Sequence, residues 1–205
     1  MTLDTLAAPA THEIDVKHSR FLARAIRVDD PAEAAGWLQL VSVADATHNC
    51  WAWRIGDDYR SSDDGEPAGT AGRPILAAID GQGFDRVVVV VTRWFGGTLL
   101  GAGGLVRAYS DAVRAGVEAA GVRRRELRAE FLVDLDHGVA GRVESDLRTR
   151  GYAVLETTYS AQVRLRLGVP HDQAETLIGT IAELTGGVSV PQPVGESWVD
   201  ADTRS

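Results

Sequence analysis

The sequence predicts an α+β protein of two domains, and three features lead to that prediction. Five consecutive valines at 87–91 form a β-branched apolar run, which is typical of a strand buried on both faces. A glycine-rich turn and an amphipathic helical pattern follow that run in residues 96–120. The strand and helix patterns restart after the arginine-rich residues 123–126, so the domain boundary is placed between residues 124 and 125.

Residues 1–11 are expected to be a flexible tail, and the first domain is predicted to span 12–124. Two short strands are predicted within residues 13–28, because apolar and polar residues alternate there. A helix should follow, since Asp30 can cap its first turn and Pro31 fits its first position.

The rest of the first domain is predicted as one strand, a short return, a loop and a helix. Residues 48–55 have strand character, and residues 59–61 return after a Gly-Asp-Asp turn. Residues 61–72 have no period and are expected to be loop. A short helix at 74–79 should then lead into the valine strand.

The second domain, 125–205, is easier to interpret because its apolar periods are regular. They predict the order β-α-β-β-α-β, which is the split-βαβ, ferredoxin-like arrangement. The last strand contains Pro191 and Pro193 and is expected at a sheet edge. The predicted strands are 131–135, 152–158, 163–167 and 188–199, and the predicted helices are 139–151 and 174–184.

Composition is typical of a soluble globular protein, and the cysteine count fits the cytoplasm. Hydrophobic residues make up 44 % and charged residues 24 % of the 205 residues, which are ordinary values. Cys50 is the one cysteine, so no intrachain disulfide can form, as is usual in a reducing compartment. The N-terminus has no signal-peptide layout and no apolar run approaches a membrane span, so no membrane partner is expected.

The charge balance argues against a general nucleic-acid-binding protein, whose domain is usually basic. The formal net charge is −8, with −3 in residues 1–124 and −5 in residues 125–205. Within the second domain, the alternating Arg164 and Arg166 form the one basic strand face. Any contact with RNA must therefore come from a local positive site.

The glycine-rich turn before the helix is the strongest candidate for such a site. The first backbone N–H groups of a helix have no partner within it, and glycine lets another molecule approach them. This arrangement can hold an anion, although glycines can also serve only tight strand–helix packing. The expected anion- or nucleic-acid-binding residues are Arg73, Arg93, Thr98, Gly101, Gly103, Gly104 and Arg107.

An acidic loop precedes this turn in the sequence. Asp63, Asp64 and Glu66 offer three carboxylates, which could hold a magnesium or calcium ion. Their spacing matches no EF-hand, and a solvated turn whose aspartates cap backbone N–H groups is the favoured interpretation. No cofactor is therefore expected, with magnesium as the alternative.

Two further groups of residues invite a functional interpretation. His48 and Cys50 would share a strand face side by side, which does not give the contact that nucleophilic catalysis needs, so no catalytic residue is predicted. Trp51 and Trp53 are expected in the core. Trp94, beside the glycine turn, is open to either interpretation.

Two long motifs then give a family resemblance. Residues 62–74 read SDDGEPAGTAGRP, and residues 93–105 read RWFGGTLLGAGGL. Both resemble the signatures of the IMPACT/YigZ family of uncharacterised proteins. The resemblance implies an N-terminal domain of the ribosomal-protein-S5 domain-2-like fold and a C-terminal ferredoxin-like domain. This pair is similar to the last two domains of the translocating elongation factor.

The resemblance also suggests a function. Eukaryotic relatives are linked to translational control through a partner protein that regulates a kinase, and the family has no established catalytic residue to carry over. The favoured hypothesis is a non-enzymatic, translation-linked binding protein that contacts RNA phosphate or a ribosomal or translation-factor partner. One alternative is a phosphate- or nucleotide-handling enzyme that uses the same turn with a metal on the acidic loop. Another is a protein-docking module built on Trp94 and Phe95.

Overall fold

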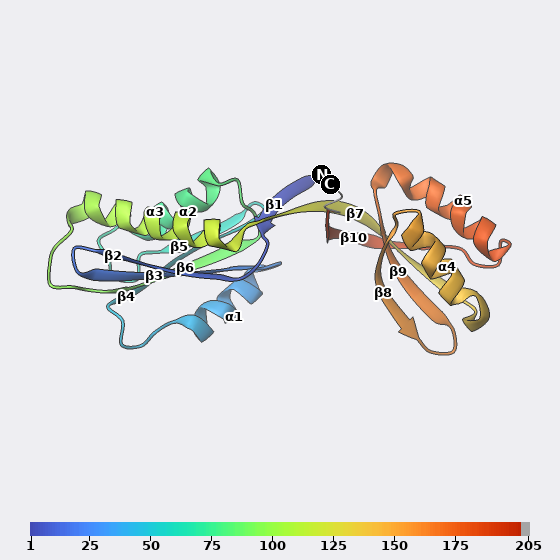
Figure 1. Ribbon diagram of the computed structural model, residues 1–205, viewed down its shortest axis with the longest axis horizontal. Coiled ribbons are helices and arrows are strands. Elements are labelled where there is room, and N and C mark those ends of the chain that lie inside the picture. Colours follow the sequence, from blue (N-terminus) through green and yellow to red (C-terminus); the bar gives the residue numbers. More distant parts are fainter. Residues whose placement is uncertain (202–205) are drawn as a thin grey trace. The chain divides into compact units, whose positions relative to one another are not determined.

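The computed structural model describes residues 1–201, which form two compact units (Figure 1). The N-terminal unit is Leu3–Arg124, and the C-terminal unit comprises Met1–Thr2 and the chain from Arg125 onward. Each unit combines an antiparallel sheet with helices, so the predicted α+β class is confirmed.

The N-terminal unit is built on a five-stranded antiparallel sheet of order β2-β3-β6-β4-β5. The valine run lies on β6, the central strand, and is fully buried, as the sequence predicts. The strands are β2 (Ala10–Val16), β3 (Ser19–Arg27), β4 (His48–Ile55), β5 (Asp58–Ser62) and β6 (Val87–Trp94).

Helices cover both faces of this sheet (Figure 1). Val89 and Val91 join the core on the side of α2 and α3, which includes Tyr109. Val88 and Val90 join the core on the side of α1. The alternation of a strand sends neighbouring valines to opposite faces, which explains why an unbroken apolar run is required. The helices are α1 (Pro31–Val41), α2 (Gly72–Gly81) and α3 (Gly101–Ala120).

The expectation of a flexible tail at residues 1–11 is wrong. Strand β1 (Thr2–Leu6) lies there, and β2 already begins at Ala10. Leu6 is buried in the core, and the N–H of Ala7 donates to the carbonyl of Gly121. A segment with little period of its own is thus ordered because Gly121 offers Ala7 a backbone partner and the core offers Leu6 an apolar site.

The C-terminal unit has two helices on one face of a sheet in which β7 pairs with β9 and β10, and β9 pairs with β8. The predicted β-α-β-β-α-β order is present, and β10 pairs with β7 alone among the described strands. Strand β7 begins at Val122, so the arginine-rich boundary is part of a continuous strand. The elements are β7 (Val122–Leu135), α4 (His137–Thr149), β8 (Ala153–Tyr159), β9 (Val163–Val169), a short 3-10 turn (His171–Gln173), α5 (Ala174–Thr185) and β10 (Gln192–Asp200).

The sheet face away from α4 and α5 carries charged side chains that neutralise one another. Arg164 Nε lies 2.7 Å from Asp134 Oδ1, and Arg166 Nη2 lies 2.7 Å from Glu130 Oε2. The alternating arginines therefore do not form a basic face, because β7 places Asp134 directly opposite Arg164, and Glu130, two positions along β7 from the residue opposite Arg166, pairs with Arg166. No helix within residues 1–201 is long and apolar enough to cross a membrane.

Candidate functional site

The first motif forms the loop between β5 and α2, and Asp63 organises it. Its carboxylate accepts backbone N–H bonds from Gly69 (2.7 Å), Ala71 (3.0 Å) and Gly72 (2.8 Å). Burial raises the pKa of this carboxyl, but these three bonds and the nearby Arg73 outweigh burial and hold its pKa below the ordinary value. Asp63 therefore acts as a structural cap for the start of α2.

The other two carboxylates of the acidic loop have separate partners. Asp64 Oδ2 accepts the backbone N–H of Asn49 at 2.6 Å, whereas Glu66 points into the interior of the unit. Residues 1–201 contain no cluster of three or more His, Cys, Asp or Glu side chains arranged to hold a metal ion. The three carboxylates named as a metal loop are thus not brought together, because each satisfies a different group of the fold.

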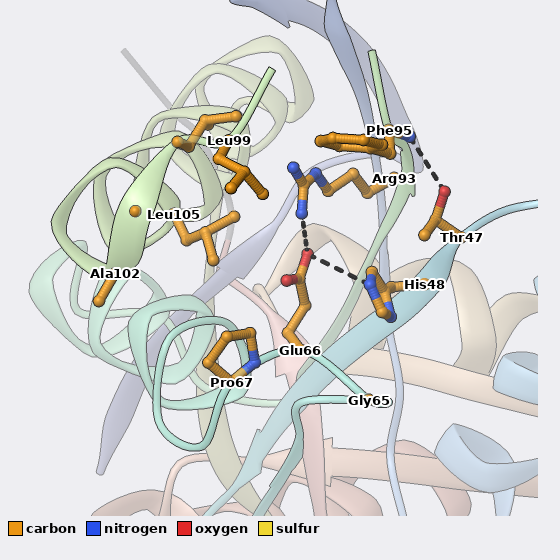
Figure 2. Close-up of a pocket in the computed structure, with 12 residues that line it drawn as sticks. Thr47, His48, Gly65, Glu66, Pro67, Arg93, Phe95, Leu99, Ala102 and Leu105 are labelled. Atoms are coloured by element: carbon orange, nitrogen blue, oxygen red, sulfur yellow. Dashed lines mark hydrogen bonds and ion pairs between the residues drawn. The ribbon is translucent and has the colours of Figure 1, made fainter. Parts of the chain in front are cut away.

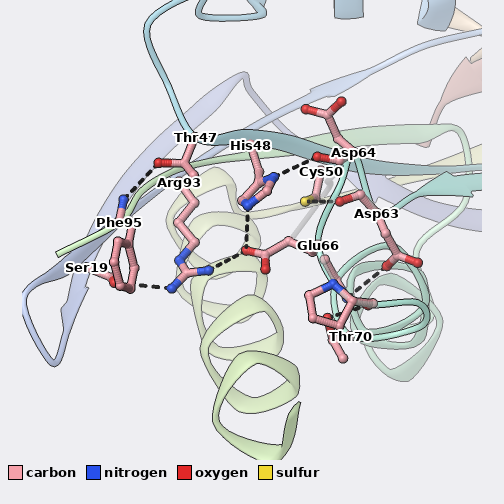
Figure 3. Close-up of polar contacts among 12 residues, drawn as sticks. Ser19, Thr47, His48, Cys50, Asp63, Asp64, Glu66, Thr70, Arg93 and Phe95 are labelled. Carbon is pink, nitrogen blue, oxygen red and sulfur yellow. Dashed lines mark hydrogen bonds and ion pairs between the residues drawn. The ribbon is translucent and has the colours of Figure 1, made fainter. Parts of the chain in front are cut away.

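Glu66 forms a buried ion pair with Arg93 of β6. Arg93 Nη1 lies 2.6 Å from Glu66 Oε1, and the two side chains are 6 % and 3 % exposed. The hydroxyl of Tyr109 on α3 donates to the same oxygen at 2.8 Å, and His48 Nε2 lies 3.8 Å from it. Figure 3 shows the Arg93 and His48 side chains directed toward this carboxylate, which joins the first motif to strands β6 and β4.

Arg93 does not provide the free positive charge that the sequence suggested. Its charge is neutralised by Glu66, because a charge buried this deeply requires a partner. Its Nη2 donates to Ser19 Oγ at 3.3 Å, and its guanidinium carbon lies 5.6 Å from the ring centre of Phe95. Its buried Nε–H has no hydrogen-bond partner.

His48 and Cys50 project from β4 and have different partners. His48 Nδ1 donates to the carbonyl of Asp64 at 2.7 Å, since a carbonyl can only accept, and this leaves Nε2 directed toward Glu66 (Figure 3). The Cys50 thiol donates to the carbonyl of Asp63 at 2.9 Å. Burial raises the pKa of Cys50 to about 12, so this thiol is not a nucleophile near neutral pH.

The second motif carries the chain from β6 to α3 through glycines with distinct roles. A Cβ on Gly96 would lie 1.9 Å from the carbonyl oxygen of His18, so only glycine fits there. Gly101 has a φ of +71°, which glycine adopts without strain. Gly103 has neither constraint, because a Cβ there would meet nothing within 4 Å.

No side chain in the described chain caps the start of α3, and its first turn contains no acidic residue. By helix geometry, the N–H groups of Gly101, Ala102 and Gly103 have no acceptor within the helix. These three residues are exposed. The start of α3 therefore presents a positive dipole end to solvent.

A pocket of about 380 Å³ lies between this helix start and the Glu66–Arg93 pair (Figure 2). Figure 2 shows the Arg93 side chain extending toward Glu66, with Phe95, Leu99 and Leu105 around it. Both motifs thus contribute to one site. Its lining residues are Thr47, His48, Gly65, Glu66, Pro67, Arg93, Phe95, Leu99, Leu100, Gly101, Ala102 and Leu105.

The expected binding residues fall into two groups. Arg93 and Gly101 line the pocket. Gly103 and Gly104 are in the first turn of α3 but outside the lining, and Gly104 is partly buried against Leu100. The other three expected residues are exposed but do not line the pocket; they are Arg73, Thr98 and Arg107.

Sequence reasoning missed Thr47, Ser19 and Tyr109 as parts of this site. In the sequence, Tyr109 is one position of the apolar stripe of the helical pattern at 96–120, and nothing there indicates a role for its hydroxyl. Phe95 N–H donates to Thr47 Oγ1 at 3.0 Å, and Gly96 N–H donates to Ser19 Oγ at 3.1 Å. The available clue was that Ser19 and Thr47 are polar residues at or beside the start of a strand.

Comparison with known proteins identifies both parts of the chain. Residues 17–117 match the family model described as the Impact N-terminal domain, and residues 133–188 match one described as a domain of unknown function, DUF1949. IMPACT family member YvyE of Bacillus subtilis is 36 % identical over 190 residues, covering 90 % of this chain and 88 % of its own. IMPACT family member YigZ of Escherichia coli is 34 % identical over 188 residues, covering 88 % and 92 %.

A crystal structure described as that of a hypothetical protein is similar over almost the whole chain. Its TM-score is 0.69 with 30 % identity, covering 96 % of this chain and 98 % of that one. The α+β class of the two units is therefore shared with an experimentally determined relative.

Proposed function

This chain belongs to the IMPACT family, and on that premise we propose that it is a translation-linked binding protein of the cytoplasm that engages its partner at the start of α3. The translation link is suggested by what the family resemblance implies for eukaryotic members. The partner is a ribosomal or translation-factor component, and the contact is binding rather than catalysis.

One observation carries this proposal: both long motifs of the sequence line a single pocket. Glu66 and Pro67 come from the first motif, and Arg93 and Gly101 come from the second. Motifs kept only for folding would have no reason to leave a shared open cavity beside an uncapped helix. Concave sites with apolar walls and a few polar groups are the usual binding sites of proteins.

The chemistry of the pocket favours a protein partner over RNA phosphate. Arg93 is neutralised by Glu66, and Phe95, Leu99 and Leu105 make the walls apolar. A polyanion approaching this site would also meet a chain of net charge −8. Arg73 and Arg107, which are exposed and in no ion pair found within residues 1–201, are the positive groups through which RNA phosphate would be contacted instead.

We propose the finer fold assignments on the same premise. The C-terminal strand arrangement, with β7 between β10 and β9 and with β8 outermost, supports a ferredoxin-like domain. The N-terminal unit corresponds to a ribosomal-protein-S5 domain-2-like domain. This pair of folds would suit a molecule that works beside the ribosome.

Co-sedimentation with purified ribosomes, with and without translation factors, tests the proposed function. Leu99→Glu in the pocket should abolish the association, whereas Leu40→Glu on α1 should not. Both leucines are 85 % exposed, so the two substitutions differ in place but not in their effect on the core. Equal association of both variants, or none by the wild type, would count against the proposal.

The enzyme alternative has its own test. A phosphate-handling enzyme should gain thermal stability from nucleotides with magnesium, because a ligand that binds only the folded state raises the melting temperature. We expect no shift across a nucleotide panel, since Asp63, Asp64 and Glu66 each have a structural partner. A magnesium-dependent shift that Asp64→Asn removes would favour the enzyme.

A further inference from the structure

We propose that the pocket binds a tyrosine side chain of the partner polypeptide. The ring of this tyrosine lies among Phe95, Leu99 and Leu105, and its hydroxyl donates a hydrogen bond to Glu66 Oε2. This inference rests on the proposed function and names the side chain by which the partner is recognised.

The carboxylate of Glu66 uses only one of its two oxygens within the fold. Oε1 accepts hydrogen bonds from Arg93 at 2.6 Å and from Tyr109 at 2.8 Å. In Figures 2 and 3, both dashed contacts of Glu66, to Arg93 and to His48, end on the same oxygen. The ion pair with Arg93 is therefore end-on, and Oε2 has no hydrogen-bond partner within residues 1–201.

This second oxygen of Glu66 can be reached from the pocket. Glu66 lines the pocket, although its side chain is only 3 % exposed. The fully enclosed side-chain atoms that lack a partner within residues 1–201 belong to other residues, so Oε2 is accessible. A buried acceptor nearly always has a donor, and a missing one costs stability. The oxygen therefore indicates a ligand that supplies a donor.

His48 presents a second acceptor to the same pocket. Its Nδ1–H donates to the carbonyl of Asp64, so its Nε2 keeps a lone pair. The residue lines the pocket, and Nε2 has no donor within hydrogen-bond distance among residues 1–201. Two acceptors without a donor favour a ligand that donates over one that only accepts.

The charges around Glu66 favour a donor that is itself uncharged. Arg93 already neutralises Glu66, so an ammonium group would add positive charge beside this guanidinium and beside the positive end of α3. A phosphate or carboxylate group would direct its own lone pairs at Glu66 and His48. A hydroxyl group donates without carrying charge, so it suits the site better than either kind of ion.

The apolar walls select a hydroxyl that is carried on a large apolar group. Leu99 is 85 % exposed and Phe95 is 46 % exposed, although both line the pocket. A serine or threonine would leave these two side chains in water. Tyrosine has its hydroxyl at the far end of the ring, so the ring covers the walls while the hydroxyl reaches Glu66. For this reason tyrosine is frequent among the side chains that anchor protein interfaces.

The experiment measures, by fluorescence anisotropy with the full chain, the binding of fluorescein-labelled heptapeptides that differ only at their central residue. Both peptide ends are blocked, so no terminal charge contributes. The tyrosine peptide should bind. The phenylalanine peptide should bind at least about tenfold more weakly, because the same ring leaves Oε2 without a donor. The phosphotyrosine peptide should also bind more weakly, because its phosphate brings negative charge to a carboxylate.

Three results of this series would overturn the proposal. They are equal binding of the tyrosine and phenylalanine peptides, tighter binding of the phosphotyrosine peptide, and no binding of the tyrosine peptide up to millimolar protein. Single-stranded RNA that displaces the tyrosine peptide would overturn it as well, since the pocket would then take a nucleic acid.

A matched pair of variants tests the place of binding. Leu99→Ser removes a wall of the pocket and should weaken binding of the tyrosine peptide at least about threefold, whereas Leu40→Ser on α1 should not. Both leucines are 85 % exposed, so neither substitution disturbs the core. Equal affinities of the two variants would exclude this pocket as the site.

Glu66→Gln tests the acceptor through selectivity. The amide oxygen should turn toward the donors Arg93 and Tyr109, which leaves N–H groups facing the pocket. The preference for tyrosine over phenylalanine should then fall at least about threefold, since a bond to a charged acceptor is the stronger one. An unchanged preference in a folded variant would exclude Glu66 as the acceptor. If this variant does not fold, the peptide series and the leucine pair still decide.

The outcomes separate this inference from the proposed function. If the tyrosine peptide binds selectively but ribosomes and translation factors do not bind, the proposed function fails and this inference stands. If ribosomes bind but the peptides show no preference for tyrosine, this inference fails alone.

Discussion

Arginine is neutralised by a carboxylate in two opposite settings of this protein. Arg93 lies beneath the pocket of the N-terminal unit, where its side chain is 6 % exposed and that of Glu66 is 3 % exposed. Arg164 lies on the open face of the C-terminal sheet, where its side chain and that of Asp134 are 54 % and 40 % exposed. The N–O distances are 2.6 Å and 2.7 Å, so distance does not distinguish the two pairs.

Exposure to solvent decides how much each ion pair contributes to stability. Water and salt screen the exposed pair, and such pairs contribute little to stability. The buried pair has lost its hydration, so breaking it would leave a charge with no compensation. The pair of Glu66 and Arg93 therefore fixes how the two motifs meet, whereas the pair of Arg164 and Asp134 mainly keeps a sheet face polar.

The largest expected effect comes from breaking the buried pair. Glu66→Ala leaves the charge of Arg93 buried and unpaired, which should lower the free energy of unfolding by roughly 3–5 kcal/mol. Chemical denaturation measures this. Replacing both residues, as Glu66→Leu with Arg93→Met, should cost clearly less than Glu66→Ala alone. If the double variant were as unstable as Glu66→Ala, the unpaired charge of Arg93 would not be the reason for the loss of stability.

Removing one donor from Glu66 should have an intermediate effect. Tyr109→Phe deletes the hydroxyl that donates to Glu66 at 2.8 Å and keeps the ring, which is fully buried. Loss of a hydrogen bond to a charged, buried acceptor should cost about 1.5–3 kcal/mol. Thermal or denaturant unfolding gives the value, and a cost near zero would mean that water replaces the hydroxyl.

The cap of the first motif should show a smaller, pH-dependent effect. Asp63→Asn removes the negative charge that three backbone N–H groups share, which should cost about 1 kcal/mol near neutral pH. The pKa of Asp63 is lowered in the folded protein, so its contribution is present above the unfolded value of about 3.9. The contribution is then lost as pH falls through the folded pKa.

Stability curves of wild type and Asp63→Asn should therefore converge in acid. The asparagine stays neutral at all pH values, so the gap between the two curves reports the ionisation of Asp63 alone. A gap that stays constant from neutral pH to well below the unfolded pKa would contradict the assignment of Asp63 as a charged cap.

The smallest effect is expected on the open sheet face. Asp134→Asn breaks the contact with Arg164 but leaves both side chains in water, so unfolding should change by no more than the experiment resolves. Added salt should make no difference to that result. A loss as large as that of Glu66→Ala would remove the contrast between the two settings.

Periodicity in the sequence was sufficient for most of the fold. The valine run identified a strand buried on both faces, and the regular apolar stripes after residue 125 predicted the order of the C-terminal elements. The N-terminal tail was mispredicted because its order depends on packing of Leu6 in the core and on the bond from Ala7 to Gly121, which lies more than a hundred residues away in the chain.

For the site, the sequence located the two motifs but not the partners of their charges. Arg93 and Glu66 were each singled out, one for an anion and the other for a metal, yet they neutralise one another. Because these two residues are far apart in the chain, no local sequence pattern could predict that they form an ion pair. His48 was noticed beside Cys50, although its polar partners are Asp64 and Glu66.

The sequence by itself determined the class of fold, the place of the motifs and the family, because these depend on local periods and on residue types at fixed spacing. The tertiary structure alone decided which charges are neutralised by ion pairs within the fold and which groups stay accessible to a partner. That outcome depends on burial and on contacts between distant segments. A carboxylate or guanidinium can attract a partner only where it is exposed to water and not already paired with an opposite charge.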